Sequence, residues 1–240
     1  KKRKIKFSSY KGDVRNFKDI KKWLKSNKDI KIVYHLAAIV PTIKVNKNKN
    51  KSINVNYKGT INLYNSIVEL NKDIWFFFAS TSHVYKLQNK PLKEKDIIKP
   101  TSFYGTTKFM AENYLLKNEN NKIKICIGRI FSVFHKNQDK SFFYPAMVSK
   151  FNKKKNIGQK SLNLKGGSSI RDFSNAESIA NIIIKLSIKK AQGIFNIGSG
   201  EKMTLLEFIK KYINNDIAIK AYGKSNMIVA NIVKLKKILI

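Results

Sequence analysis

The chain has 240 residues, 42% of them hydrophobic, which fits one sizeable globular domain or two small ones. Its net charge of +34 attracts phosphate in general, but only four of the 49 basic residues are arginine and the lysines occur in every segment, which argues against specific nucleic-acid binding. One cysteine excludes a disulfide framework, and no apolar stretch approaches the ~20 residues of a membrane span, so we expect a soluble, cytoplasmic protein.

Short apolar runs alternate with helical patterns through the first half of the chain. We expect strands in 31–38, 74–80 and 123–130, and helices in 52–70 and 104–118. Strands that are apolar on both faces and separated by helices are typical of βαβ units. The pattern therefore predicts an α/β fold, a doubly wound parallel sheet with helices on both sides.

The pattern loosens beyond residue 131. We expect helices in 148–153 and 176–189, then the short strand "GIFNIG", then a helix that opens at Thr204. Glu207, three residues after Thr204, gives a capping-box pattern at the start of that last helix. We interpret this half of the chain as a smaller part that covers the substrate.

The expected sheet predicts where a ligand would bind, because ligands of such sheets bind outside the carboxyl ends of the strands. Ala37 and Ala38 follow the first strand, residues 80–82 follow the second, and Ser132 follows the third. Tyr104 begins the helix after the second strand. All of these residues should line one crevice.

Tyr104 and Lys108 stand four residues apart, so on a helix they share a face. A nearby ammonium favours the phenolate, which lets a tyrosine exchange protons with a substrate hydroxyl near neutral pH. The pair also arises by chance in a chain with this much lysine, so it needs support from other motifs.

That support comes from a family resemblance over nearly the whole chain. "FFASTSHVYK" and "PTSFYGTTK" resemble the extended short-chain dehydrogenase/reductase family, the nucleotide-sugar epimerases, dehydratases and reductases. Further matching motifs follow the family's order: "GDVRN", "YHLAA", "NVNYKGTINL", "GRIFSVF", "IRDFSNAESIA" and "FNIGSG". The resemblance implies a Rossmann-like fold, NAD or NADP as cofactor, a nucleotide-diphosphate sugar as substrate, and an isomerase or oxidoreductase role in polysaccharide biosynthesis.

The resemblance also assigns the catalytic residues. Tyr104 would exchange a proton with a sugar hydroxyl, and Lys108 would hold the nicotinamide ribose and lower the pKa of the phenol. Thr81 would bridge the substrate oxygen and the phenol, with Ser80 and Ser82 as one-residue alternatives. Ordinary turn chemistry is the competing explanation for this hydroxyl cluster.

Cofactor-binding residues follow from the same comparison and include Tyr104 and Lys108. Asp13 would accept a hydrogen bond from the adenine amino group, or is an ordinary turn aspartate. Ala37 and Ala38 would let the backbone approach the cofactor, although packing alone also favours small residues there. Asn56 would be the family's helix asparagine near the active site.

Substrate-binding residues are expected at Thr81, Ser82, Ser132 and Arg171. The Arg171 guanidinium suits the oxygens of a diphosphate, and the alternative is a plain surface arginine. No metal site is expected, because no histidine has a second ligand at a suitable spacing.

Three departures from the family pattern limit the assignment. No GxxGxxG turn is present, so we expect an N-terminally truncated chain without its first βαβ unit. Residues 1–130 would then be a partial NAD(P)-binding domain, and 131–240 a substrate-binding part able to exchange segments with it. Ser82 and His83 stand where 4,6-dehydratases carry Asp and Glu, which disfavours dehydration, and Ser132 replaces the common Asn of the epimerases.

The leading hypothesis is an NAD(P)-dependent nucleotide-sugar 4-epimerase that moves hydride and proton transiently at a sugar carbon. The first alternative is a nucleotide 4-keto-sugar reductase, and the second is a truncated, non-catalytic relative. Helix 104–118 is a candidate surface for a homodimer.

Overall fold

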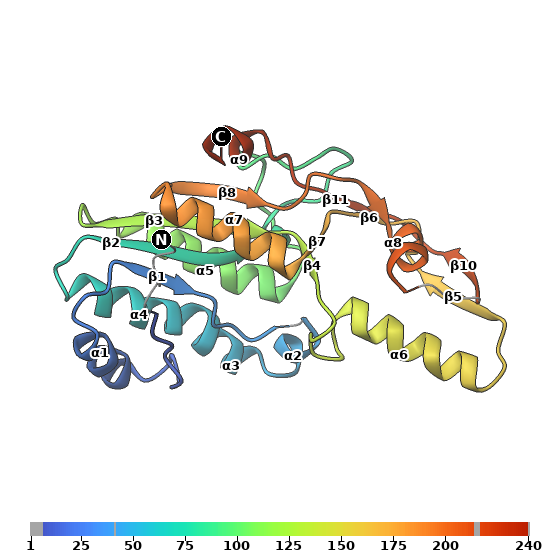
Figure 1. Ribbon diagram of the computed structural model, residues 1–240, viewed down its shortest axis with the longest axis horizontal. Coiled ribbons are helices and arrows are strands. Elements are labelled where there is room, and N and C mark those ends of the chain that lie inside the picture. Colours follow the sequence, from blue (N-terminus) through green and yellow to red (C-terminus); the bar gives the residue numbers. More distant parts are fainter. Residues whose placement is uncertain (1–6, 41, 214–216, 240) are drawn as a thin grey trace, which may run out of the picture.

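The computed structural model describes residues 7–40, 42–213 and 217–239. Its main sheet has four parallel strands in the order β1-β2-β3-β8 (Figure 1). These strands are β1 (Ile32–His35), β2 (Ile74–Thr81), β3 (Ile123–Ile130) and β8 (Gly193–Ile197). The predicted parallel sheet and its three predicted strands are confirmed.

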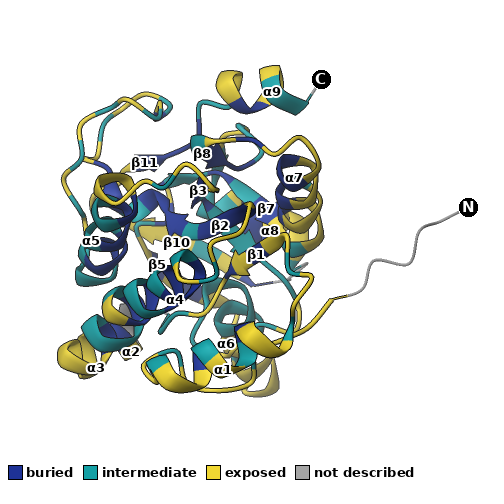
Figure 2. Cartoon of the chain, turned by 90° about the vertical axis from the view of Figure 1, so that its left-hand side faces the viewer, coloured by how far each residue is buried: buried dark blue, intermediate teal, exposed yellow. Residues whose placement is uncertain are grey.

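Helices cover both faces of this sheet, as the doubly wound prediction requires. They include α1 (Phe17–Ser26), α4 (Gly59–Val68) and α5 (Phe103–Lys117) on one face, and α7 (Ala176–Ile188) and α9 (Val233–Leu239) on the other. Strand β2 explains the arrangement, because Phe76 and Phe78 enter the first cluster while Trp75 and Phe77 enter the second. Figure 2 shows the buried strands between helices with exposed outer sides.

The helix expected in 52–70 is longer and contains a wide turn. It runs through α3 (Lys49–Ile53), the π-helical segment η1 (Asn54–Lys58) and α4 without a break. Wide turns of this kind are rare and often stand at functional sites. Hydrophobic spacing does not reveal such an extra residue, so the sequence pattern missed it.

Polar caps mark where several of the other helices begin. Ser102 accepts a hydrogen bond from the Gly105 amide at 3.1 Å at the start of α5, and Asn175 accepts one from the Ser178 amide at 2.7 Å at the start of α7. The predicted capping box of Thr204 and Glu207 is confirmed at the start of α8 (Leu205–Tyr212).

The remaining elements lie mainly beyond the carboxyl ends of the parallel strands (Figure 1). They are α2 (Thr42–Lys47), the 3₁₀ turn η2 (Ser82–Val84), β4 (Ser132–Phe134), α6 (Phe143–Asn156), β5 (Ser161–Lys165), β6 (Ile170–Arg171), β7 (Phe173–Asn175), β9 (Met203–Thr204), β10 (Ala218–Tyr222) and β11 (Met227–Ile228). Strands β5 and β10 are paired, as are β4 and β7, and β11-β6-β9 form a small sheet. Three elements from the second half of the chain, α7, β8 and α9, return to the main sheet. The division of the chain into two parts at residue 130 stays a prediction.

No helix in the described ranges is both long and apolar enough to span a bilayer.

The two-faced core gives a stability prediction. Ile127 of β3 is completely buried, so Ile127→Ala should lower the free energy of unfolding by about 2–5 kcal/mol. Ile97→Ala is the matched control, since that side chain is 68% exposed and its loss should change the free energy by less than about 0.5 kcal/mol. Urea unfolding followed by circular dichroism measures both, and equal losses would contradict the core assignment.

Candidate active site

The first turn of α5 lies directly on the turn that follows β2. The Thr101 amide donates to the His83 carbonyl at 2.9 Å, and a Cβ added to Gly105 would come within 2.4 Å of the same carbonyl oxygen. The rings of His83 and Tyr104 meet edge to face with centroids 6.1 Å apart. Tyr104 therefore stands beside the Thr81 end of the strand, as the sequence predicts.

Lys108 lies one turn further along α5 and is only 1% exposed. Its Nζ atom is 4.7 Å from the centre of the Phe78 ring, and no hydrogen bond or ion pair to it occurs among the residues that the structure describes. Burial lowers the pKa of Lys108 to about 7, and the charge of Glu112 partly opposes this shift. A buried ammonium with three unused donors is suited to a ligand that carries hydroxyl groups.

The phenol of Tyr104 behaves differently from the expectation. Burial raises its pKa above the ordinary value of 10.0, so in this structure the expected lowering by Lys108 is wrong. The cause is the desolvation of the buried phenol itself, which disfavours the charged phenolate. At neutral pH Tyr104 holds its proton.

The hydroxyl cluster at the end of β2 has divided roles. Thr81 accepts a hydrogen bond from the His83 amide at 3.3 Å, so it does take part in the turn. That bond uses an acceptor lone pair and leaves the Thr81 hydroxyl proton for another partner. Ser80 donates to the Glu112 carboxylate instead, while Ser82 is buried at the start of η2.

Asn56, in the π-helical segment, fastens the loop after β1 to α5. Its Oδ1 accepts from the Ile39 amide at 2.7 Å, and its Nδ2 donates to the Ile39 carbonyl and to Thr107 Oγ1, both at 3.2 Å. Both amide protons of this fully buried side chain are therefore engaged inside the protein. Direct cofactor contact by Asn56 stays a prediction.

His35 is a structural histidine within this region. The Thr60 hydroxyl donates to the Asn56 carbonyl at 2.8 Å, so the 2.9 Å contact between His35 Nε2 and Thr60 Oγ1 has the imidazole as donor. Burial, followed by the charge of Lys108, lowers the pKa of His35 to about 3 and keeps the ring neutral. In the described ranges, no three His, Cys, Asp or Glu side chains gather as a metal-ligand group.

Arg171 reaches the same end of the sheet from β6. Its Nη1 donates to the carbonyls of Ile170 at 2.8 Å and Asn226 at 3.1 Å. Burial lowers the pKa of His83, and the charge of Arg171 lowers it further, so the guanidinium acts electrostatically on the turn next to Tyr104. Arg171 is half-buried, unlike a plain surface arginine.

The loop and strand residues expected nearby are less deeply placed. Ala37 is exposed and Ala38 half-buried, so described neighbours do not require a small side chain at Ala37. Ser132 is half-buried at the start of β4, where its amide donates to the Asp172 carbonyl at 3.0 Å. Their roles toward cofactor and substrate stay predictions.

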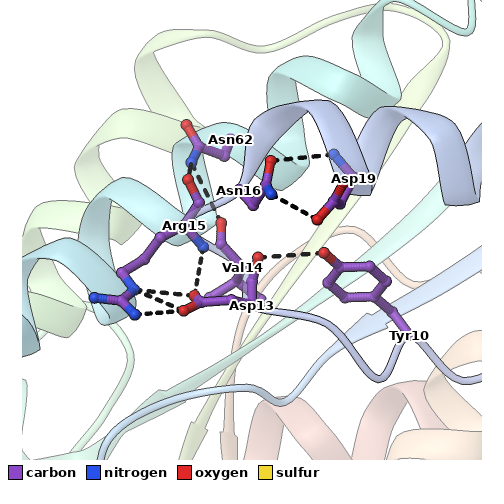
Figure 3. A network of polar contacts seen from close by, with 7 residues as sticks. All are labelled: Tyr10, Asp13, Val14, Arg15, Asn16, Asp19 and Asn62. Atoms are coloured by element: carbon purple, nitrogen blue, oxygen red, sulfur yellow. Dashed lines mark hydrogen bonds and ion pairs between the residues drawn. The ribbon is translucent and has the colours of Figure 1, made fainter.

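Asp13 lies in a separate network at the start of α1 (Figure 3). Its carboxylate accepts from the Arg15 amide at 2.9 Å and forms a 2.5 Å ion pair with the Arg15 guanidinium. Hydrogen bonds from Arg15 lower the pKa of Asp13 to about 2. Both residues line an open hollow of about 630 Å³ together with Asn16, Phe17 and Lys18. Asp13 therefore stabilises the turn in which it lies, and its contact with adenine stays a prediction.

Sequence reasoning missed two buried carboxylates close to these residues. Glu112 forms an ion pair with Arg129 at 2.7 Å, and its position four residues after Lys108 was the available signal. Asp172 accepts hydrogen bonds from the amides of Ser199 at 2.8 Å and Gly200 at 2.9 Å. An acidic residue beside Arg171 gave no hint that it would turn inward.

Comparison with known proteins agrees with this fold and arrangement. The family model described as GDP-mannose 4,6 dehydratase matches residues 1–238. The UDP-glucose 4-epimerase of Mycoplasma genitalium is 28% identical over 86% of this chain and 69% of its own length. The dTDP-4-dehydro-6-deoxyglucose reductase of Escherichia coli is 27% identical over 77% of this chain and 59% of its own length.

Solved structures give the same picture. The UDP-N-acetylglucosamine 4-epimerase of Methanobrevibacter ruminantium, in complex with UDP-N-acetylmuramic acid, has a TM-score of 0.80 and 29% identity, with 95% of this chain and 75% of that chain covered. RMD from Pseudomonas aeruginosa, complexed with NADPH, shares the fold at a TM-score of 0.83 and 16% identity, with 96% and 81% covered. The fold and site define an extended short-chain dehydrogenase/reductase. Within that class, the chain belongs to the NAD(P)-dependent epimerase/dehydratase family that the GDP-mannose 4,6 dehydratase model represents.

The role of Asn56 gives a prediction about local order. Asn56→Ala should lower the free energy of unfolding by about 1–3 kcal/mol, because Ile39 and Thr107 lose a buried partner. Amide hydrogen exchange at Ile39 should also become faster. Asn181→Ala, at an exposed position of helix α7, is the matched control and should leave both quantities unchanged. Unchanged exchange at Ile39 in Asn56→Ala would refute the fastening role.

Proposed function

We propose that this chain carries the catalytic residues of an NAD(P)-dependent nucleotide-sugar 4-epimerase. The observation that carries the proposal is the buried Lys108, which has no hydrogen-bond partner among the described residues and stands one turn from Tyr104. The relatives named UDP-glucose 4-epimerase and UDP-N-acetylglucosamine 4-epimerase support this choice of reaction.

The residues fit a nicotinamide cofactor at the Lys108 side. When bound, such a cofactor takes hydrogen from a sugar carbon and returns it. The unused donors of Lys108 suit adjacent ribose hydroxyls, and the exposed Ala37 leaves room beside the loop after β1. The sequence contains no GxxGxxG turn, so the pyrophosphate has no assigned partner in these 240 residues.

The protein's own groups then manage the sugar oxygen and its proton. Tyr104 passes a proton between its phenol oxygen and the sugar oxygen, and the Thr81 hydroxyl donates to that oxygen and holds it in place. Arg171, beside His83, binds the diphosphate through charge-assisted hydrogen bonds. Ser82 and Ser132 line the sugar side.

A 4-keto-sugar reductase is the second candidate, and two observations favour it. The raised pKa of Tyr104 keeps the phenol protonated, which is the form that gives a proton to a ketone oxygen during reduction. The Escherichia coli relative is named as such a reductase. Dehydration is less suited to this site, because Ser82 and His83 follow Thr81 where two carboxylic acids would be needed.

A substrate panel separates these candidates. The chain, and the chain with any further sequence that its gene encodes, is mixed with UDP- and dTDP-sugars with and without NADH or NADPH. An isomer formed without net change in nicotinamide absorbance supports the epimerase. Reduced cofactor consumed only with a 4-keto-sugar supports the reductase, and calorimetry without any nucleotide-sugar binding supports a non-catalytic relative.

The proton role of Tyr104 can be tested by removing one oxygen. In the form active on this panel, Tyr104→Phe should lower turnover roughly 10²–10⁴-fold, because the acid/base group is lost. Nucleotide-sugar affinity by calorimetry should stay within about twofold. Tyr222→Phe is the matched control, since that ring is 55% exposed and lies in β10, and it should retain full turnover. Normal turnover by Tyr104→Phe would remove the phenol from the mechanism.

A further inference from the structure

The ion pair of Glu112 and Arg129 is almost entirely shielded from solvent. The side chains are 1% and 3% exposed, and the guanidinium makes contacts of 2.7–3.2 Å with the carboxylate oxygens. Arg129 also donates to the Glu94 carbonyl at 3.0 Å and lies 4.7 Å from the centre of the Tyr85 ring. The desolvation of two buried charges offsets much of the attraction between them, so fold stability alone is a weak reason for the presence of this ion pair.

The Glu112 carboxylate of this pair joins the two elements that hold the candidate active site, while Arg129 ties it to β3. Glu112 lies on α5, four residues after Lys108 and eight after Tyr104. Ser80, next to Thr81 on β2, donates to the Glu112 carboxylate. One carboxylate therefore links the strand that carries Thr81 to the helix that carries the other two residues.

Among the residues that the structure describes, the Glu112 carboxylate is the negative charge that acts on Lys108. From β1, the neutral ring of His35 is within reach of the charge of the ammonium, and from β2 the centre of the Phe78 ring lies 4.7 Å from it. Tyr104 on the same helix keeps its proton, and His83 of η2 faces Tyr104. Glu112 raises the pKa of Lys108 against the larger effect of burial, and the result is a pKa of about 7.

We propose that Glu112, held by Arg129 and Ser80 one helical turn from Lys108 on the same face of α5, is a positioning residue that favours the protonated form of Lys108. Arg129 neutralises part of the Glu112 charge, so the carboxylate supports the ammonium without locking it in an ion pair. Lys108 then keeps its donors for a ligand and can gain or lose its proton near neutral pH. The consequence for turnover rests on the proposed function, whereas the effect on the Lys108 proton does not.

The test measures the Lys108 proton directly in the chain without substrate. The protein is labelled with ¹³C at lysine Cε, the Lys108 signal is identified by its loss in Lys108→Met, and its shift is followed from pH 5 to 11. Glu112→Gln should move the Lys108 titration about one unit or more toward lower pH, because the ammonium loses its negative neighbour. Glu112→Asp keeps the charge and should titrate close to wild type.

The two variants separate charge from packing. A purely structural role predicts that the shorter Glu112→Asp perturbs the site more than the nearly isosteric Glu112→Gln. If Glu112→Gln does not fold, Glu112→Gln/Arg129→Met, which lacks both charges, is measured in its place and should also titrate below wild type. Glu201→Gln, at an exposed position, is the matched control and should show no shift.

A Lys108 titration that stays within about 0.2 pH unit of wild type in the folded Gln variant would overturn the proposal, since an effective neighbouring charge gives about one unit or more. The substrate panel is a separate readout. A shifted titration in a protein that converts no nucleotide-sugar would count against the proposed function alone. An active protein with an unshifted titration would count against the role of Glu112 alone.

Discussion

The close approach of α5 to the end of β2 is the constraint on which the candidate site depends. Gly105 permits it, because any side chain there would meet the His83 carbonyl at 2.4 Å. The backbone itself thus sets the distance between the turn after Thr81 and the first turn of α5. This contact fixes the positions of Tyr104 and Lys108, since the helix is rigid and the two residues stand four apart on one face.

Burial then determines the chemistry of the residues that the contact brings together. In water a tyrosine near an ammonium would lose its proton more easily, but here both groups are removed from solvent. The pKa of Tyr104 rises and that of Lys108 falls to about 7, because burial disfavours the charged form of each group. A bound ligand that brings hydroxyl groups to Lys108 would favour the ammonium and so reduce the proton affinity of the phenol.

The sequence predicted the fold well where the local pattern was strong. The both-faced burial of β2 follows from the unbroken run "IWFFFAS", and the α8 capping box follows from the spacing of Thr204 and Glu207. Helix α1 was missed although Phe17, Ile20 and Leu24 recur at helical spacing in it. The π-helical segment at Asn56 was missed because it differs from a regular helix only in its hydrogen bonds.

The places of the candidate residues in the fold were predicted better than their interactions. The family motifs point to Tyr104, Lys108 and Arg171, and they lie at one end of the sheet as expected. The pKa of the phenol was predicted in the wrong direction, because a residue pattern carries no information about desolvation. Glu112 and Arg129 also escaped notice, since two charged residues far apart in sequence look like surface residues until the fold buries them together.

A second junction explains how the C-terminal half is aligned with this site. Asp172 is completely buried, and its carboxylate accepts from Ser199, Gly200 and the Ala230 amide, so it ties three segments of the chain together. Gly198 makes room for it, because a Cβ there would lie 2.4 Å from the carboxylate. Arg171 directly precedes this anchored residue, and its charge lowers the pKa of His83. The buried Asp172 thus fixes the backbone next to Arg171, just as Ser80 and Arg129 fix the buried Glu112 on the helix that carries Lys108.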